Sequence, residues 1–123
     1  MKNDQVKKAS VDMKYFREAV GSDEKFKRDV FTIFRSNVDR NIRKMERAIE
    51  RGVNTVTNIS WNMAAHSFKG SASSIGMFKL AEILEYAQKH PEETVEQKTE
   101  ILNKVKEEVA LILEFINQEL LGE

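Results

Sequence analysis

Residues 64–76 read Ala-Ala-His-Ser-Phe-Lys-Gly-Ser-Ala-Ser-Ser-Ile-Gly, and the rest of the chain reads as a scaffold that holds this stretch. Each residue of an α-helix advances about 100° around the axis, so the apolar residues of this region fall within an arc of about 100°. They are Trp61, Ala64, Ala65, Phe68, Ala72 and Ile75. The pattern predicts an amphipathic helix whose apolar face is buried against other helices.

His66 lies about 150° from the centre of this stripe, so we expect its imidazole to be exposed to water. Lys69 follows at i+3 and places a cation beside the ring, and Gly70 at i+4 leaves bare backbone where a side chain would otherwise lie. A glycine inside a helix costs about 1 kcal/mol relative to alanine, which suggests a role in the close approach of another molecule. Together these features favour a histidine that accepts a phosphoryl group from a docked partner over a surface histidine without a role.

The run Ala65-His66-Ser67-Phe68-Lys69-Gly70-Ser71-Ala72, followed by Ile75-Gly76, resembles the signature of histidine-containing phosphotransfer (HPt) domains, the carriers of multistep phosphorelays. The resemblance covers roughly residues 10–120. It implies that His66 is the phosphoacceptor, that Lys69 stabilises the phosphoryl charge and that Gly70 leaves room for a receiver domain. It also implies a glutamine near the histidine on the following helix, for which Gln88 is the candidate; an ordinary surface glutamine is the alternative.

The length and composition fit one small helical domain. We expect a flexible polar leader at 1–9 and a single domain at 10–121. The 20 basic and 20 acidic residues give a formal net charge of zero, which disfavours nucleic-acid binding. The chain has no cysteine and no apolar run of the length that a membrane span needs, so we expect a cytoplasmic protein without a membrane contact.

Apolar periodicity and capping residues predict five helices. The first is capped within residues 10–13 and ends at Gly21, and the second starts at 22–24 and ends at Gly52. The third opens at Asn54 or Thr55 and closes at 74–76, the fourth begins at Met77 and ends at His90, and the last runs from about Pro91 or Glu93 to Leu121. The fold class is therefore all-α, an up-down antiparallel four-helix bundle with a short additional N-terminal helix. The expected core of the second helix is Phe26, Val30, Ile33, Phe34, Val38, Ile42, Met45 and Ile49. In the last helix it is Val95, Ile101, Leu102, Val105, Val109, Ile112, Leu113, Ile116 and Leu120.

A basic cluster runs from Arg40 to Arg51 in the second helix. Asp39, Glu46 and Glu50 interrupt it. We interpret it as a solvated face and assign it no function.

The sequence lacks the residue patterns that metal binding, nucleotide binding and serine hydrolysis require. Neither histidine has the spacing of a helical metal site, so we expect no metal. The sequence also lacks a Gly-Lys-Ser/Thr phosphate loop, and no carboxylate is placed to orient His66 as the base of a serine hydrolase. We therefore expect the protein to be a phosphoryl carrier and not an enzyme. We expect it to bind no cofactor and to rely on magnesium held by its receiver partner.

The expected docking surface consists of Gly70, Met63 and Ser73 around the histidine, joined by Met13 or Phe16 from the first helix. Burial of these apolar side chains in the bundle is the alternative. The resemblance implies the receiver domains of response regulators and a hybrid sensor kinase as partners, and we expect a monomer.

Two other functions are alternatives, and the first of them would use the same surface. The first is a non-phosphorylated helical adaptor that binds a receiver domain or another regulator. The second, the phosphoacceptor part of a sensor kinase, requires an ATP-binding domain and a different sequence around the histidine, which this chain lacks.

Overall fold

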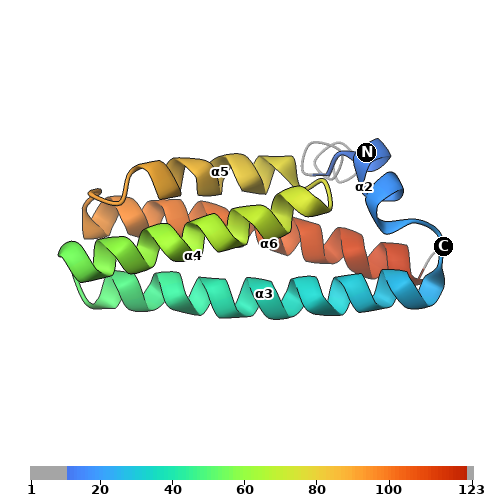
Figure 1. Cartoon of the computed structure of the whole chain (residues 1–123), viewed down its shortest axis with the longest axis horizontal. Coiled ribbons are helices and arrows are strands. Elements are labelled where there is room, and N and C mark those ends of the chain that lie inside the picture. Colours follow the sequence, from blue (N-terminus) through green and yellow to red (C-terminus); the bar gives the residue numbers. More distant parts are fainter. Residues whose placement is uncertain (1–10, 122–123) are drawn as a thin grey trace.

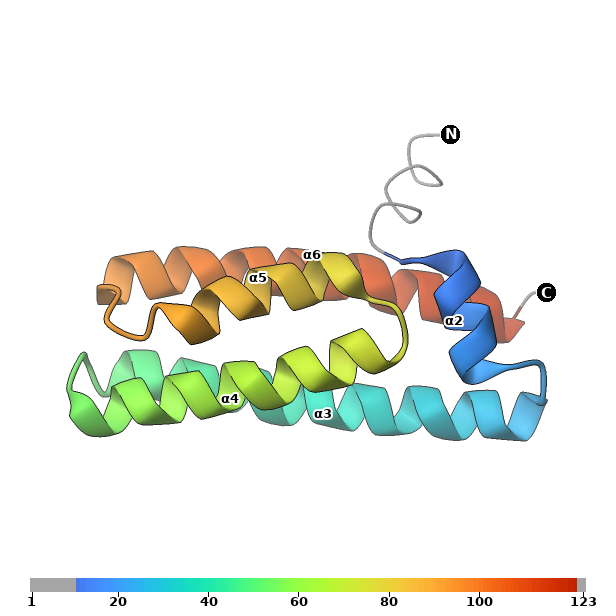
Figure 2. The same ribbon diagram turned by 45° about the horizontal axis from the view of Figure 1, so that its top comes forward.

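A computed structural model describes residues 11–121 of the chain. The leader predicted at 1–9 and Ser10, the first residue of the predicted cap of the first helix, lie outside this range. The described part is all-helical, as the sequence predicts. Its helices are α2 (Met13–Val20), α3 (Glu24–Glu50), α4 (Thr55–Ser74), α5 (Phe78–Lys89) and α6 (Val95–Leu121). Figures 1 and 2 show α3 to α6 along the long axis of the molecule, with α2 across one end.

Polar side chains fix where the helices begin. The Asp12 side chain accepts a hydrogen bond from the Tyr15 amide at 3.0 Å, and Asn54 and Thr57 form a reciprocal capping box at the start of α4. The last helix begins at Val95, later than the predicted 91 or 93. Thr94 and Gln97 cap it, because each side chain accepts a hydrogen bond from the other residue's amide.

The α4 helix lies between α3 and α5 and contacts both. The six apolar residues predicted to form its inner face are all buried, so this prediction is confirmed. Trp61 is fully buried, and its indole N–H donates to the carbonyl of Ala87 in α5 at 3.0 Å. This bond satisfies the one polar atom of the largest core side chain and fixes the register of α4 against α5.

The core of α3 differs from the predicted set. Phe26 and Ile33 are 51% and 61% exposed, whereas Phe31 is buried. The buried residues recur at alternating steps of three and four: Phe31, Phe34, Val38, Asn41, Met45 and Ala48. This seam contains the polar residue Asn41, which a stripe chosen by apolar character alone passes over.

The α6 helix also departs from its predicted core. Val95 is 38% exposed because it is the first residue of the helix, and Phe115 is buried. Two charged residues, Lys98 and Glu108, are buried in addition. The ammonium of Lys98 donates to Asn58 Oδ1 at 2.9 Å and lies 5.2 Å from the centre of the Trp61 ring.

Gly76 joins α2 to the turn between α4 and α5. Its carbonyl accepts a hydrogen bond from the Asp12 amide at 2.9 Å, and its φ of +83° favours glycine. A Cβ atom at this position would lie 3.1 Å from the Asp12 carbonyl oxygen. The absence of a side chain therefore lets the start of α2 pack directly on this turn.

None of the helices between residues 11 and 121 combines the length and apolar character that crossing a membrane requires.

Candidate functional site

His66 lies on the outer face of α4 and its side chain is exposed. Ala65 and Phe68, on the opposite face, are fully buried and fix the rotation of the helix. In the described part of the chain no hydrogen bond or ion pair engages the imidazole. Both ring nitrogens are therefore available to a molecule that approaches from solvent, as the sequence predicts.

The flank of α4 beyond His66 is open. No atom outside the local helix backbone lies within 4 Å of a Cβ built on Gly70. The fold itself therefore does not require a glycine here, in contrast to Gly76. The space above Gly70 is available to another molecule.

Lys69 lies one turn beyond His66, but its cation is already paired. Its Nζ is 3.2 Å from Oε1 of Glu85 in α5, and Lys89 Nζ is 2.9 Å from the other carboxylate oxygen. Hydrogen bonds from Lys89 and then Lys69, together with the charges of both, hold the pKa of the Glu85 carboxyl below its usual value. The sequence analysis did not identify this pairing, because it depends on the register of two helices.

Gln88 lies about one helical turn away from the level of His66. Asn62 Nδ2 donates to the backbone carbonyl of Gln88 at 2.7 Å, so Gln88 is level with Asn62, four residues or about 6 Å before His66. Glu85, not Gln88, reaches the turn that follows the histidine. Within residues 11–121 no hydrogen bond joins the Gln88 side chain to the imidazole, and its role stays a prediction.

Of the predicted docking residues, those on α4 are accessible to solvent, whereas those on α2 pack against the core. Met63 is 64% exposed one turn before His66, and Ser73 is half-buried two turns beyond it. Phe16 is only 1% exposed and packs between Phe31 and Phe115, so its proposed place in a docking surface is wrong and the alternative of burial holds.

Met13 is half-buried and packs against the core. It belongs to α2, which meets the chain at Gly76, beyond the end of α4. That end lies eight residues, or about 12 Å, beyond His66. The first helix therefore does not flank the histidine closely.

Several apolar residues near the site are exposed although the sequence assigned them to the core or to no role. Val56 and Ile59 on α4 are 69% and 55% exposed, and Ile33 on α3 borders a groove of about 140 Å³. That groove is lined by Val30, Ile33, Phe34, Asn37, Ser71, Ser74 and Ile75. The spacing of Val56, Ile59 and Met63 at i, i+3 and i+7 is the signal that could have indicated a second, outward apolar row.

Across the described residues no group of three or more acidic, histidine or cysteine side chains is arranged to hold a metal ion. Comparisons with protein-family models, with curated proteins and with solved structures gave no match.

Proposed function

We propose that this chain is a histidine phosphotransfer protein of a multistep two-component phosphorelay. In this proposal the four long helices form an up-down antiparallel bundle, α2 is the additional N-terminal helix, and His66 exchanges a phosphoryl group with receiver-domain aspartates. The observation that carries the proposal is the exposed His66 ring, free of partners in the described part of the chain, with Lys69 one turn on and open space above Gly70.

The transfer is a single displacement at phosphorus. The lone pair of His66 Nε2, the nitrogen implied by the HPt resemblance, forms the N–P bond as the acyl P–O bond of the aspartyl phosphate breaks. The aspartate leaves as a carboxylate, and Nδ1 keeps its proton. The neutral imidazole is the nucleophilic form of the side chain. The reverse displacement passes the group to a second receiver.

Lys69 supplies the nearest cation for the phosphoryl oxygens in this proposal. To reach them it must exchange its carboxylate partner, Glu85, for the phosphoryl group. Glu85 keeps a partner during this exchange, because Lys89 Nζ lies 2.9 Å from its second oxygen. Lys69 can therefore turn toward the phosphohistidine without leaving a carboxylate unpaired.

The partner supplies the remaining chemistry. A receiver domain contributes the aspartate and its magnesium ion, and this chain binds no cofactor of its own and is no enzyme. Receivers of response regulators and of a hybrid sensor kinase are the proposed partners of a monomeric, cytoplasmic carrier. An unobstructed α4 face supports a monomer in this proposal, because the relay needs His66 accessible in turn to each receiver.

The test follows labelled phosphate from a phosphorylated receiver to this chain. The expected product is acid-labile, base-stable phosphate on the wild-type chain and none on His66→Gln. His90→Gln is the matched control, because His90 is the second histidine of the chain and its ring packs against Tyr86, with ring centroids 4.2 Å apart. Label that persists on His66→Gln, or that is lost from His90→Gln, would reject the site.

The adaptor is the second candidate function, and the pairing of Lys69 with Glu85 favours it in one respect: without a phosphoryl group this cation already has a stable role. An adaptor would bind the receiver equally well with glutamine at position 66. Receiver binding without transfer, unchanged in His66→Gln, would therefore assign the adaptor in place of the carrier.

A further inference from the structure

The charges that alternate along α3 separate onto two faces once the helix forms. Lys44, Arg47 and Arg51 line a groove of about 410 Å³ against α4. Glu46 instead faces α6, where one of its carboxylate oxygens lies 2.9 Å from Lys106 Nζ. At about 100° per residue the three acidic residues of this segment lie roughly 90–135° from the centre of the basic row. The cluster that reads as mixed in the sequence is therefore a row of cations on the surface next to α4.

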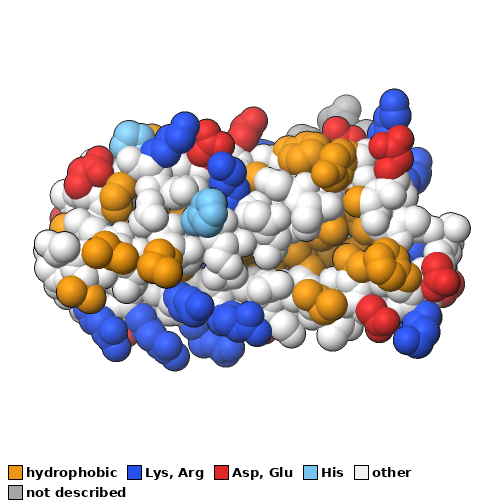
Figure 3. Space-filling view, viewed as in Figure 1, with side chains coloured by type: hydrophobic (Ala, Val, Ile, Leu, Met, Phe, Trp, Pro, Cys, Tyr) orange, Lys and Arg blue, Asp and Glu red, His pale blue; other side chains and the backbone are white. Residues whose placement is uncertain are grey.

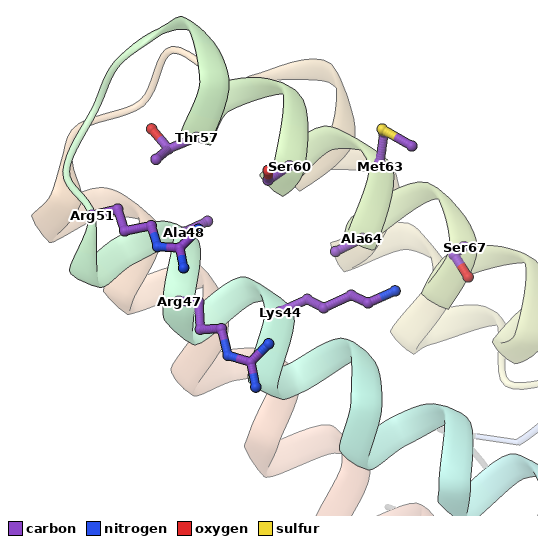
Figure 4. A pocket seen from close by; sticks show the side chains of 9 residues that line it. All are labelled: Lys44, Arg47, Ala48, Arg51, Thr57, Ser60, Met63, Ala64 and Ser67. Atoms are coloured by element: carbon purple, nitrogen blue, oxygen red, sulfur yellow. The ribbon is translucent and has the colours of Figure 1, made fainter.

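These cations lack acidic partners. All three are exposed, and no carboxylate within residues 11–121 lies within ion-pair distance of any of them. Figure 4 shows Lys44 and Arg47 on α3 and Arg51 at its C-terminal cap, while Ser60, Met63 and Ser67 line the same groove from α4. Three like charges within two helical turns repel one another mildly, and an acidic ligand would relieve that repulsion.

An apolar row lies beside the basic one. Val56, Ile59 and Met63 share one side of α4 and are 69%, 55% and 64% exposed. Figure 3 shows orange apolar side chains over α4 next to blue basic side chains over α3. From Val56 to Met63 the row advances by seven residues, about 10 Å or two helical turns, which matches the contact made by two turns of an amphipathic helix.

We propose that these six residues, Lys44, Arg47, Arg51, Val56, Ile59 and Met63, form a docking surface for an amphipathic helix of a protein partner whose apolar stripe is flanked by acidic side chains. The partner's apolar side chains cover the row on α4, and its carboxylates pair with the cations on α3. A small anion would satisfy the cations but leave the apolar row in water, so the combination of the two rows favours a protein segment. This inference goes beyond the phosphoryl transfer proposed for His66, since binding here requires no phosphoryl group.

The test uses two synthetic helical peptides of about 15 residues, identical in their leucine stripe and flanked by glutamate in one and lysine in the other. Each is titrated into the isotope-labelled full chain, and amide shifts are followed by NMR. The glutamate peptide should shift amides of the six-residue surface, and raising the salt from about 50 to 500 mM should weaken its binding at least tenfold. The lysine peptide should bind at least tenfold more weakly than the glutamate peptide.

Matched variants test the assignment of residues. Lys44→Glu combined with Arg47→Glu should weaken binding of the glutamate peptide at least tenfold, and Met63→Ala should weaken it as well. Arg28→Glu combined with Lys104→Glu makes the same change in net charge on exposed residues away from the groove and should leave the affinity within about twofold. Circular dichroism verifies that every variant is folded.

Three results would overturn the proposal. The first is equal affinity for the two peptides, the second is equal weakening in the control pair, and the third is a set of shifted amides away from these six residues. Failure of the glutamate peptide alongside tight binding of a DNA duplex would assign the basic row to nucleic acid instead. Because none of these measurements involves phosphate transfer, their outcome is independent of the relay experiment with His66→Gln.

Discussion

Lys69 Nζ lies 3.2 Å from Oε1 of Glu85, so the cation that follows His66 by one turn is held by a carboxylate of the neighbouring helix. The same carboxylate binds Lys89 on its other side. In the proposed relay this arrangement makes Glu85 a competitor of the phosphoryl group for Lys69.

Glu85→Gln should therefore favour phosphorylation of His66. Removing the carboxylate that competes for Lys69 should raise the equilibrium constant for phosphorylation of His66, but only modestly, because exposed ion pairs are weak. The measurement is the partition of labelled phosphate between the chain and a receiver. Glu82→Gln, on the same helix and exposed, is the control and should change nothing. If Glu85→Gln instead lowers the phosphorylated share of the chain, Glu85 holds Lys69 in a position that favours phosphorylation.

The titration of Glu85 gives a second check. Because Lys89 and Lys69 lower the pKa of this carboxyl, it should titrate below the ordinary glutamate value of 4.5. A lowered folded-state pKa means that the pairing stabilises the fold above the ordinary glutamate range and that this stabilisation is lost as the pH falls through the lowered pKa. Carbon-13 NMR of the carboxyl should show a higher pKa in both Lys89→Met and Lys69→Met. An unchanged pKa in either variant would contradict the pairing of that lysine with Glu85.

Gly70→Ala should separate stability from docking. Nothing lies near the added methyl group, and alanine is the better helix former, so the free energy of unfolding in urea should rise by about 0.5–1 kcal/mol. Phosphate transfer from a receiver should slow, whereas phosphorylation by the small donor phosphoramidate should not. Unchanged transfer from the receiver would remove Gly70 from the docking surface.

Gly76→Ala is expected to act in the opposite direction on stability. The φ of +83° disfavours a side chain, and the new Cβ would crowd the Asp12 carbonyl oxygen at 3.1 Å. Strain of this kind costs about 1–3 kcal/mol, which urea unfolding would measure. Gly52→Ala is the control, because its φ is also +83° but no atom lies within 4 Å of its added Cβ. The difference between the two variants is the cost of separating α2 from the turn.

Lys98 should make the free energy of unfolding depend on pH in the alkaline range. Burial lowers the pKa of its ammonium, with Glu92 and Glu93 opposing the shift only in part. The unfolded chain then binds more protons than the folded one, so stability rises as the pH increases through the lowered pKa toward the ordinary lysine value of 10.5. Lys98→Met should remove this rise while changing stability at neutral pH by less than about 2 kcal/mol. Urea unfolding at a series of pH values measures both, and an unchanged pH profile would contradict the assignment.

Helical periodicity predicted the elements well, because the spacing of apolar residues is a property of each segment alone. The stripe from Trp61 to Ile75 is buried as expected, and because His66 lies on the opposite face of the same helix, it is exposed. The same reasoning failed for Phe26 and Ile33, whose burial depends on which neighbouring helix reaches them. It also passed over Asn41, because a polar residue in a seam is recognisable only once the seam is known.

The sequence by itself determined an all-helical chain and an outward histidine with a lysine and a glycine one turn beyond it, since these depend on distances along one helix. The tertiary structure alone decided what meets that surface from other helices. The register of α5 against α4 gave Lys69 its carboxylate, and the rotation of α3 gathered Lys44, Arg47 and Arg51 on the side of α4 while turning Glu46 toward α6. Such contacts join residues far apart in the chain, so they are fixed only when the helices pack.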